Sequence, residues 1–283
     1  MRFGMNLLLW TGDATGEEFL PLLERLKGMG YDGVEIPIFN LEVERYAKLG
    51  RRLDDLGLAR TGVTVRSSAD DPMSADPKVR QNGIDNNKRA LDCCHAGGMT
   101  VLAGPYHSAI GQFSGKGATP DEWKIAVESM RVVAEHAGRL GVTLSLEYLN
   151  RFECYLLNCA SDATRFVNEV GLASCRAMWD TFHAHIEEKD AEEAIRTLSP
   201  VMAHVHISEN DRSTPGRGQV NWKATFDTLK AVGYDGWMVV EAFGQALPEL
   251  AAATKIWRRM FESEEKLAAD ALAFMKSEWG KRS

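Results

Sequence analysis

Short apolar segments alternate along the chain with longer segments that have helical spacing. The apolar segments are nearly continuous in hydrophobic residues and bounded by Gly, Asp or Asn, which is typical of parallel strands buried on both faces. They lie at residues 3–9, 33–38, 60–66, 99–103, 142–147, 175–180, 201–207 and 236–241. The helical segments lie at residues 17–29, 42–56, 77–96, 120–140, 161–170, 190–198 and 221–232. Eight strands alternating with helices predict a (β/α)8 barrel, the TIM barrel.

Signals at the helix ends support this division. Thr119 precedes Pro120 and two acidic residues, which is a strong helix start, and Ser161 opens the next helix. Glycines follow six helical segments, as helix C-termini prefer: Gly30, Gly57, Gly97, Gly141, Gly171 and Gly233. The glycine-rich dinucleotide fingerprint does not follow the first strand, which disfavours a doubly wound sheet.

We find no linker or low-complexity segment in the sequence, and therefore predict a single α/β domain over residues 1–283. The barrel would occupy residues 1 to about 246. The last part, from about 247 to 283, mixes apolar and charged residues with helical spacing. We expect it to form a helical extension that wraps the barrel or mediates oligomerisation.

Composition and charge exclude several classes of protein. The chain has 33 basic and 40 acidic residues and a net charge of −7, which argues against a nucleic-acid partner. No apolar run approaches the ~20 residues that span a bilayer, so no membrane association is expected. The first apolar stretch is too short and too poor in positive charge for a signal peptide, which predicts a cytoplasmic protein.

Cysteine chemistry is not expected to matter. The five cysteines form no Cys-x-x-Cys pair and do not suggest a disulfide framework. The adjacent Cys93 and Cys94 fall in a helical segment, where packing explains them better than a redox role.

The ends of the last four predicted strands carry the strongest chemical signal. Strands five to eight end in Glu147, Asp180, His206 and Glu241, each about one βα unit of ~30 residues from the next. Because the C-terminal ends of the strands meet at one rim of such a barrel, we expect these side chains to converge there.

Three converging carboxylates would repel one another unless a cation compensates them. Oxygen ligands with one imidazole suit Mn²⁺, Mg²⁺ or Co²⁺ better than a thiolate-rich zinc site does. Any one of these acidic residues alone could be a helix cap or a loop residue. The four together predict a site for one divalent metal ion.

More polar residues follow the same strands. They occupy residues 150–153, 181–183 and 208–212, and are either substrate contacts or surface charges. Three segments that contain the strand ends and these residues resemble the ketose 3-epimerases, a family of the xylose-isomerase-like barrels that acts on D-tagatose, D-allulose (D-psicose) and L-ribulose. The segments are residues 146–153, 179–188 and 204–212. The resemblance extends over essentially the whole chain, including the Gly-Pro-Tyr turn at 104–106.

The resemblance implies a role for each candidate residue. Glu147, Asp180, His206 and Glu241 match the metal ligands of the family, and Glu147 and Glu241 also match its acid/base pair. Glu153, His183 and Arg212 match its substrate-binding residues. The family is usually activated by Mn²⁺ or Co²⁺ and forms dimers or tetramers, so we expect Mn²⁺ and a homodimer or homotetramer. Residues 106–113 lack the Trp that some members have there, which leaves the preferred sugar open.

These residues would support epimerisation at C3 of a free ketose. The C3 proton lies beside the C2 carbonyl, so its removal gives an enediolate, and a metal ion would stabilise the developing charge. Inversion requires proton removal on one face and delivery on the other. Strands five and eight lie on opposing sides of the ligand set, so Glu147 and Glu241 can flank the sugar. No strand end carries Lys, which disfavours a Schiff-base aldolase.

Several alternatives stay open. An aldose–ketose, hydroxypyruvate or inosose isomerase on the same scaffold could use the same four ligands, although Glu153 and Arg212 favour the epimerase. An apurinic endonuclease would need more His ligands and a basic face. A non-catalytic sugar-binding protein has little reason to keep two carboxylates across a metal. Residues 213–218 could bind a phosphorylated sugar, but a turn before a helix capped near Asn221 explains them better.

Overall fold

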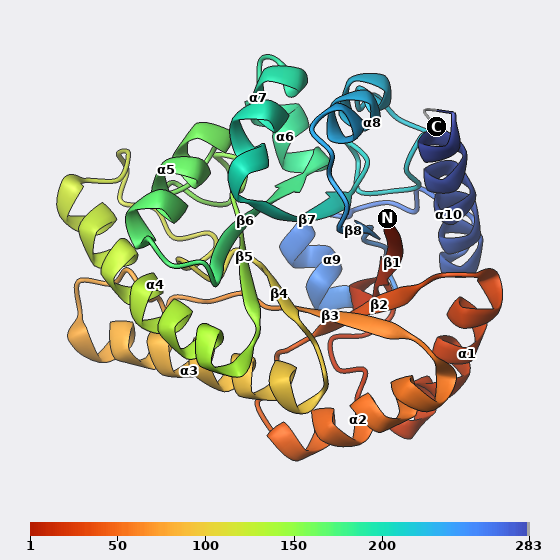
Figure 1. Ribbon diagram of the computed structural model, residues 1–283, viewed down its shortest axis with the longest axis horizontal. Coiled ribbons are helices and arrows are strands. Elements are labelled where there is room, and N and C mark those ends of the chain that lie inside the picture. Colours follow the sequence, from red (N-terminus) through yellow and green to blue (C-terminus); the bar gives the residue numbers. More distant parts are fainter. Residues whose placement is uncertain (282–283) are drawn as a thin grey trace.

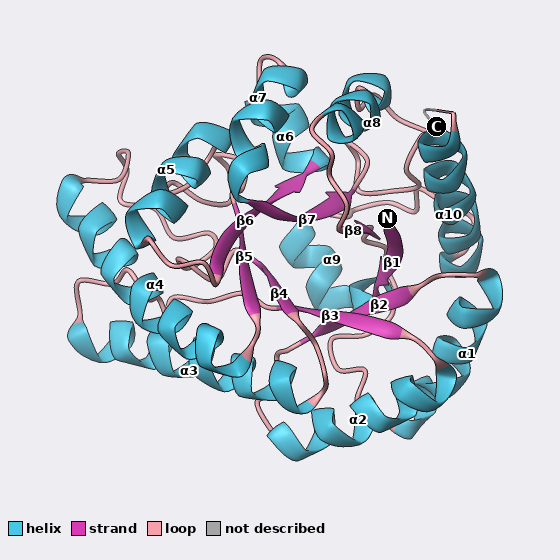
Figure 2. Ribbon diagram, viewed as in Figure 1, coloured by secondary structure: helices cyan, strands magenta, loops and turns pink. Residues whose placement is uncertain are grey.

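The computed structural model describes residues 1–281. Eight parallel strands close into a barrel in chain order, with β1 beside β8 (Figures 1 and 2). The strands are β1 (Arg2–Asn6), β2 (Gly33–Pro37), β3 (Ala59–Val63), β4 (Val101–Gly104), β5 (Thr143–Glu147), β6 (Cys175–Asp180), β7 (Met202–Ile207) and β8 (Trp237–Val240). The predicted (β/α)8 barrel is confirmed.

Most of the helices surround the barrel, whereas α9 (Pro248–Thr254) is seen within the ring of strands in this view (Figure 2). The helices are α1 (Leu20–Met29), α2 (Val43–Leu56), α3 (Pro77–Ala96), α4 (Pro120–Leu140), α5 (Ala160–Val170), α6 (Thr181–Glu187), α7 (Ala191–Leu198), α8 (Trp222–Ala231), α9 (Pro248–Thr254) and α10 (Glu264–Gly280). Three short 3-10 helices accompany them at Leu7–Leu9, Glu17–Phe19 and Ser199–Val201. Among the described helices, none is long and apolar enough to cross a membrane.

Two of the predicted caps are present, but the one at Ser161 is wrong: α5 begins at Ala160, and Cys159 is at its N-cap position without a side-chain hydrogen bond. Thr119 and Glu122 form a reciprocal capping box at the start of α4. Asn221 caps α8 by accepting a hydrogen bond from the Ala224 backbone N–H. Cys93 and Cys94 are buried in α3, and all five cysteines are free thiols, as expected from the sequence.

The structure differs from the sequence-based boundaries where side chains bond to nearby backbone. The first strand ends at Asn6 rather than at residue 9, because the Asn6 side chain accepts from the Leu8 N–H and starts a 3-10 helix. The third ends at Val63 rather than at residue 66. Helix α6 was not expected: Asp180 caps it through hydrogen bonds from the Phe182 and His183 N–H groups.

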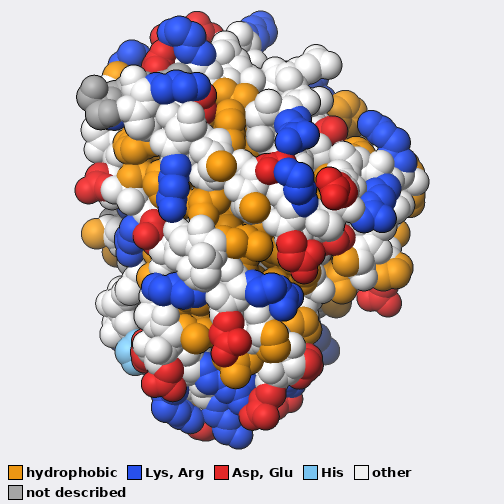
Figure 3. Space-filling view, turned by 90° about the vertical axis from the view of Figure 1, so that its right-hand side faces the viewer, with side chains coloured by type: hydrophobic (Ala, Val, Ile, Leu, Met, Phe, Trp, Pro, Cys, Tyr) orange, Lys and Arg blue, Asp and Glu red, His pale blue; other side chains and the backbone are white. Residues whose placement is uncertain are grey.

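The C-terminal segment forms two helices, α9 and α10, that pack at different places on the barrel. Helix α10 packs on the outside of β1 and β8 (Figure 1). The buried Tyr31 hydroxyl donates a 2.7 Å hydrogen bond to the Ala268 carbonyl in this helix. Helix α9 instead helps to line the pocket at the C-terminal end of the barrel. On the side of the molecule that carries α1 and α10, acidic and basic side chains are interspersed, with hydrophobic side chains between them (Figure 3).

Gly33 gives a test of the packing that closes the barrel. A Cβ at this first residue of β2 would lie 2.3 Å from the Ala59 carbonyl oxygen and 2.6 Å from the Trp237 ring. Since backbone of the neighbouring strand cannot give way, we expect Gly33→Ala to lower the free energy of unfolding by about 1–3 kcal/mol. In Gly28→Ala, near the end of α1, the Cβ meets nothing within 4 Å. This control should stabilise by about 0.5–1 kcal/mol in urea titrations, and equal effects of the two variants would contradict the packing described here.

Candidate active site

Four side chains from four neighbouring strands meet at one end of the barrel. Glu147 and Asp180 are the last residues of β5 and β6, His206 lies in β7, and Glu241 follows β8 directly. All four are buried, and one potential ligand atom from each lies within 4.8 Å of the others. The structure therefore brings together the four residues that the sequence singled out as a possible metal site.

The unpaired atoms in this cluster fit a divalent cation. His206 Nδ1 and Glu147 Oε1 are buried and have no hydrogen-bond partner. His206 Nδ1 lies 3.4 Å from both Asp180 Oδ2 and Glu241 Oε1, and 3.9 Å from Glu147 Oε1. Burying such atoms without a partner is costly, whereas three carboxylate oxygens and one imidazole nitrogen form a suitable donor set for a cation.

The two carboxylate oxygens of Asp180 have different roles: one caps a helix and the other belongs to the four-residue cluster. Its Oδ1 accepts the N–H groups that cap α6, and its Oδ2 faces His206. The sequence left open whether such a residue is a helix cap or a ligand. In the structure the cap orients the side chain and leaves the second oxygen for the cluster.

Glu35 is a member of the site that the sequence analysis missed. This fully buried carboxylate in the middle of β2 lies behind His206, and its Oε1 is 2.7 Å from His206 Nε2. The available signal was a single acidic residue inside an apolar strand, Val34-Glu35-Ile36, which the pattern analysis treated as part of the strand only.

Arg212 links the cluster to its surroundings. Its Nη1 lies 2.5 Å from Glu241 Oε2 and 3.4 Å from Asp180 Oδ2, and its guanidinium stacks 3.7 Å above the Phe182 ring centre. The residue has φ = +62°, a conformation that is strained for a residue with a side chain. Strain of this kind occurs at functional sites, where surrounding contacts hold it in place.

Hydrogen-bond donors lie against both ring nitrogens of His183. The backbone N–H of Asn150 lies 3.0 Å from Nδ1 and Arg212 Nη2 lies 2.9 Å from Nε2, and a neutral ring can accept from only one of them. Burial and the nearby Arg212 lower the pKa of His183 to about 3, which keeps the ring neutral. Asn150 also donates to Glu153 Oε1 at 2.8 Å, which places Glu153 next to this group.

The two glutamates of the cluster have opposite electrostatic environments. Burial and the negative charge of Glu241 raise the pKa of Glu147 well above its ordinary value. Burial also acts to raise the pKa of Glu241, but His206 and Arg212 outweigh it and lower the pKa to about 2. Without a cation, Glu147 is therefore set to carry a proton and Glu241 to be ionised.

A cavity of about 160 Å³ opens beside the cluster. Its polar lining consists mainly of Glu147, Glu153, His183, Arg212 and Glu241. Apolar side chains form most of the remaining wall, among them Leu8, Val63 and Phe243, and α9 contributes Leu250. All three predicted substrate-binding residues therefore line the same cavity as the two glutamates, and Asp180 and His206 lie behind it.

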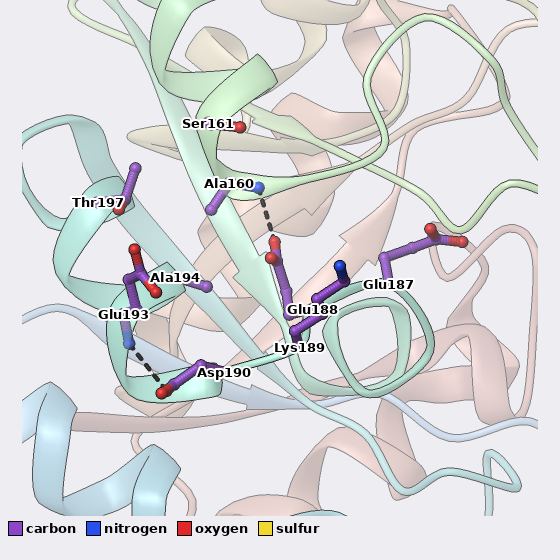
Figure 4. A pocket seen from close by; sticks show the side chains of 9 residues that line it. All are labelled: Ala160, Ser161, Glu187, Glu188, Lys189, Asp190, Glu193, Ala194 and Thr197. Atoms are coloured by element: carbon purple, nitrogen blue, oxygen red, sulfur yellow. Dashed lines mark hydrogen bonds between the residues drawn. The ribbon is translucent and has the colours of Figure 1, made fainter.

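A second pocket, between the start of α5 and the α6–α7 segment, does not offer comparable chemistry (Figure 4). Three of its acidic side chains already have partners, and Glu187 forms an ion pair with Arg151. Glu188 accepts from the Ala160 N–H, and Asp190 accepts from the Glu193 N–H. These carboxylates cap the starts of α5 and α7, so the barrel-end cavity is the candidate active site.

Similar proteins identify the family to which this chain belongs. Residues 23–278 match the sequence model of the xylose isomerase-like TIM barrel family. The ketose 3-epimerase of Arthrobacter globiformis is 32% identical to this chain over 281 residues, which cover 98% of this chain and 96% of that protein. The chain belongs to this barrel family, among the ketose 3-epimerases. Ketose 3-epimerases are isomerases, so the protein is an enzyme of the isomerase class.

Solved structures of this family have the same architecture. An L-ribulose 3-epimerase superposes with a TM-score of 0.92 at 30% identity, over 99% of this chain and 95% of that one. A D-psicose 3-epimerase from Clostridium cellulolyticum H10, solved with D-tagatose, superposes with a TM-score of 0.91 at 28% identity, over 99% of both chains.

Thermal unfolding tests whether the cluster binds a cation. Mn²⁺ added to the chelator-treated protein should raise its Tm, because a ligand at 100 times its Kd stabilises the folded state by about 2.7 kcal/mol. Asp180→Asn should lose most of this gain, since an amide can still cap α6 but is a poorer ligand than a carboxylate. Asp190→Asn makes the same change at the α7 cap and should respond like wild type. No Mn²⁺-dependent shift in wild type would contradict the metal site.

Proposed function

We propose that this protein is a metal-dependent ketose 3-epimerase that inverts C3 of a free ketose. The observation that carries the proposal is the position of Glu147 and Glu241. Both belong to the four-residue cluster and both line the cavity. Two carboxylates that reach one substrate from different strands are what a two-base inversion requires.

The two glutamates would take opposite roles in one turnover. Ionised Glu241, held by Arg212 and His206, would take the C3 proton on one face of the sugar. Protonated Glu147 would deliver a proton to the other face, and the roles reverse in the opposite direction. A divalent cation held by Glu147, Asp180, His206 and Glu241 would act as a Lewis acid on the substrate oxygens and stabilise the charge that develops there.

Arg212 and His183 would bind the oxygen that gains charge. Arg212 Nη2 lies 2.9 Å from His183 Nε2, beside Glu147 and Glu241. In the tautomer of the neutral His183 ring that carries its proton on Nε2, both groups would be N–H donors to an enediolate oxygen, and the buried position strengthens such hydrogen bonds. Glu153, oriented by Asn150, would accept from a sugar hydroxyl.

The substrate class follows from the relatives. We infer that the enzyme accepts one or more of D-tagatose, D-allulose with its epimer D-fructose, and L-ribulose. Mn²⁺ is the metal we expect, with Co²⁺ or Mg²⁺ as substitutes. A homodimer or homotetramer stays a prediction from the family resemblance.

Isotope exchange tests the proposed reaction. The Mn²⁺-loaded enzyme, incubated in D₂O with each of the three ketoses, should form the C3 epimer with deuterium at C3 and none at C1. The reason is that proton removal and delivery by two carboxylates exchange the proton with solvent. Product separation with NMR of the C1 and C3 positions gives the answer.

The same experiment separates the alternatives. An aldose–ketose isomerase would produce an aldose and place deuterium at C1, or transfer hydrogen internally between C1 and C2. Aldose formation with an untouched C3 would refute the epimerase assignment.

A further inference from the structure

Glu35 forms a hydrogen-bonded layer with the strands on either side of β2. Asn6 in β1, Glu35 in β2 and Thr61 in β3 are direct partners in register. Asn6 Nδ2 donates to Glu35 Oε1 at 3.0 Å, and Thr61 Oγ1 donates to Glu35 Oε2 at 2.9 Å. The first three strands, which supply no residue to the four-residue cluster, therefore fix the position of one buried carboxylate.

This carboxylate extends across the barrel to β7. Its Oε1 lies 2.7 Å from His206 Nε2, and its Oε2 lies 2.8 Å from His204 Nε2, at an angle that does not make a hydrogen bond. The Asn6 amide N–H can only donate to Glu35, the Thr61 hydroxyl donates to it as well, and an ionised carboxylate has no proton to give. The proton shared with His206 must therefore be on His206 Nε2.

The proton on Nε2 determines the state of Nδ1, the other ring nitrogen of His206. With Nε2 protonated, the lone pair of the neutral ring is on Nδ1, which is the unpaired atom that faces Asp180, Glu241 and Glu147. A carboxylate that accepts from the far nitrogen of a metal-binding His fixes its tautomer and ring orientation and makes it a better ligand.

We propose that Glu35 is the positioning residue of the metal site: through His206 Nε2 it sets which nitrogen of His206 faces the cation and how tightly the cation is held. Glu35 does not line the cavity, so it acts through His206 and touches no substrate. The proposal rests on the metal dependence of the proposed function. It also assigns a task in metal binding to strands β1 to β3, which supply no residue to the four-residue cluster.

A second cation among Glu35, His204 and His206 is the competing explanation for the same residues, since their donor atoms also lie close together. Two observations favour the hydrogen-bonded layer. Both oxygens of Glu35 already accept from Asn6 and Thr61, and His206 Nε2 is at hydrogen-bond distance from Glu35. The number of bound ions separates the two explanations.

Mn²⁺ titration by calorimetry, on chelator-treated protein without sugar, tests the proposal independently of activity. Wild type should bind one Mn²⁺ per chain. Glu35→Gln keeps the size of the side chain but removes its charge, and should weaken Mn²⁺ binding by about 10–100-fold. At Mn²⁺ concentrations that saturate the variant, the KM for the sugar should return close to the wild-type value, because no substrate contact has changed.

Thr61→Val is the matched control. It removes a hydrogen bond to the same carboxylate but leaves the charge of Glu35 and its contact with His206 in place. We expect lower stability and nearly wild-type Mn²⁺ affinity. If Glu35 were only structural, both variants would lose stability and neither would lose Mn²⁺ affinity, which would overturn the proposal.

If Glu35→Gln does not fold, a measurement on the wild-type protein still tests the proposal. In ¹⁵N-histidine NMR spectra of the Mg²⁺-loaded protein, His206, assigned by comparison with His206→Gln, should carry its proton on Nε2. A proton on Nδ1, or two ions bound per chain, would refute the proposal. Absence of any Mn²⁺ binding by wild type would instead refute the metal dependence of the proposed function, whereas equal binding by wild type and Glu35→Gln refutes the role of Glu35 alone.

Discussion

The structure depends on how the negative charge of four buried carboxylates is compensated inside one barrel. Glu35, Glu147, Asp180 and Glu241 are each 5% exposed or less. Four negative charges this close cannot all remain ionised without compensation. The positive charge of Arg212 supplies part of it beside Glu241, and a hydrogen bond with His206 stabilises Glu35. A divalent cation would supply the rest at the position where His206 Nδ1 and Glu147 Oε1 have no partner.

This constraint explains the division of work around the barrel. Strands β5 to β8 carry the residues that converge on the cavity, and the helix cap at Asp180 and the strained backbone at Arg212 hold two of them in place. Strands β1 to β3 carry the hydrogen-bonded layer around Glu35. The cavity lies between these parts, and α9 closes part of its wall. Strands β1 to β3 thus help to position the four-residue cluster, although they supply none of its residues.

The barrel and the four-residue cluster could be predicted because both follow from simple periodicity. The alternation of apolar and helical segments predicts the barrel. Because a barrel places the C-terminal ends of all its strands at one rim, Glu147, Asp180, His206 and Glu241 could be predicted to lie close together without any measured distance. Glu35 could not be found in this way, because its role comes from pairing with residues far away in sequence. Helix α6 was missed for a related reason: its start depends on a side chain that also ends a strand.

The central claim is that Glu147 and Glu241 serve opposite faces of the sugar, and single-turnover exchange in D₂O tests it most directly. Each Mn²⁺-saturated variant, Glu147→Gln and Glu241→Gln, is mixed with each C3 epimer of the preferred ketose, after its bound metal has been measured. The account predicts almost no net epimerisation by either variant. It also predicts that each variant exchanges the C3 hydrogen of one epimer only, and that the two variants exchange opposite epimers. Exchange of both epimers by either variant, or of the same epimer by both, would contradict it.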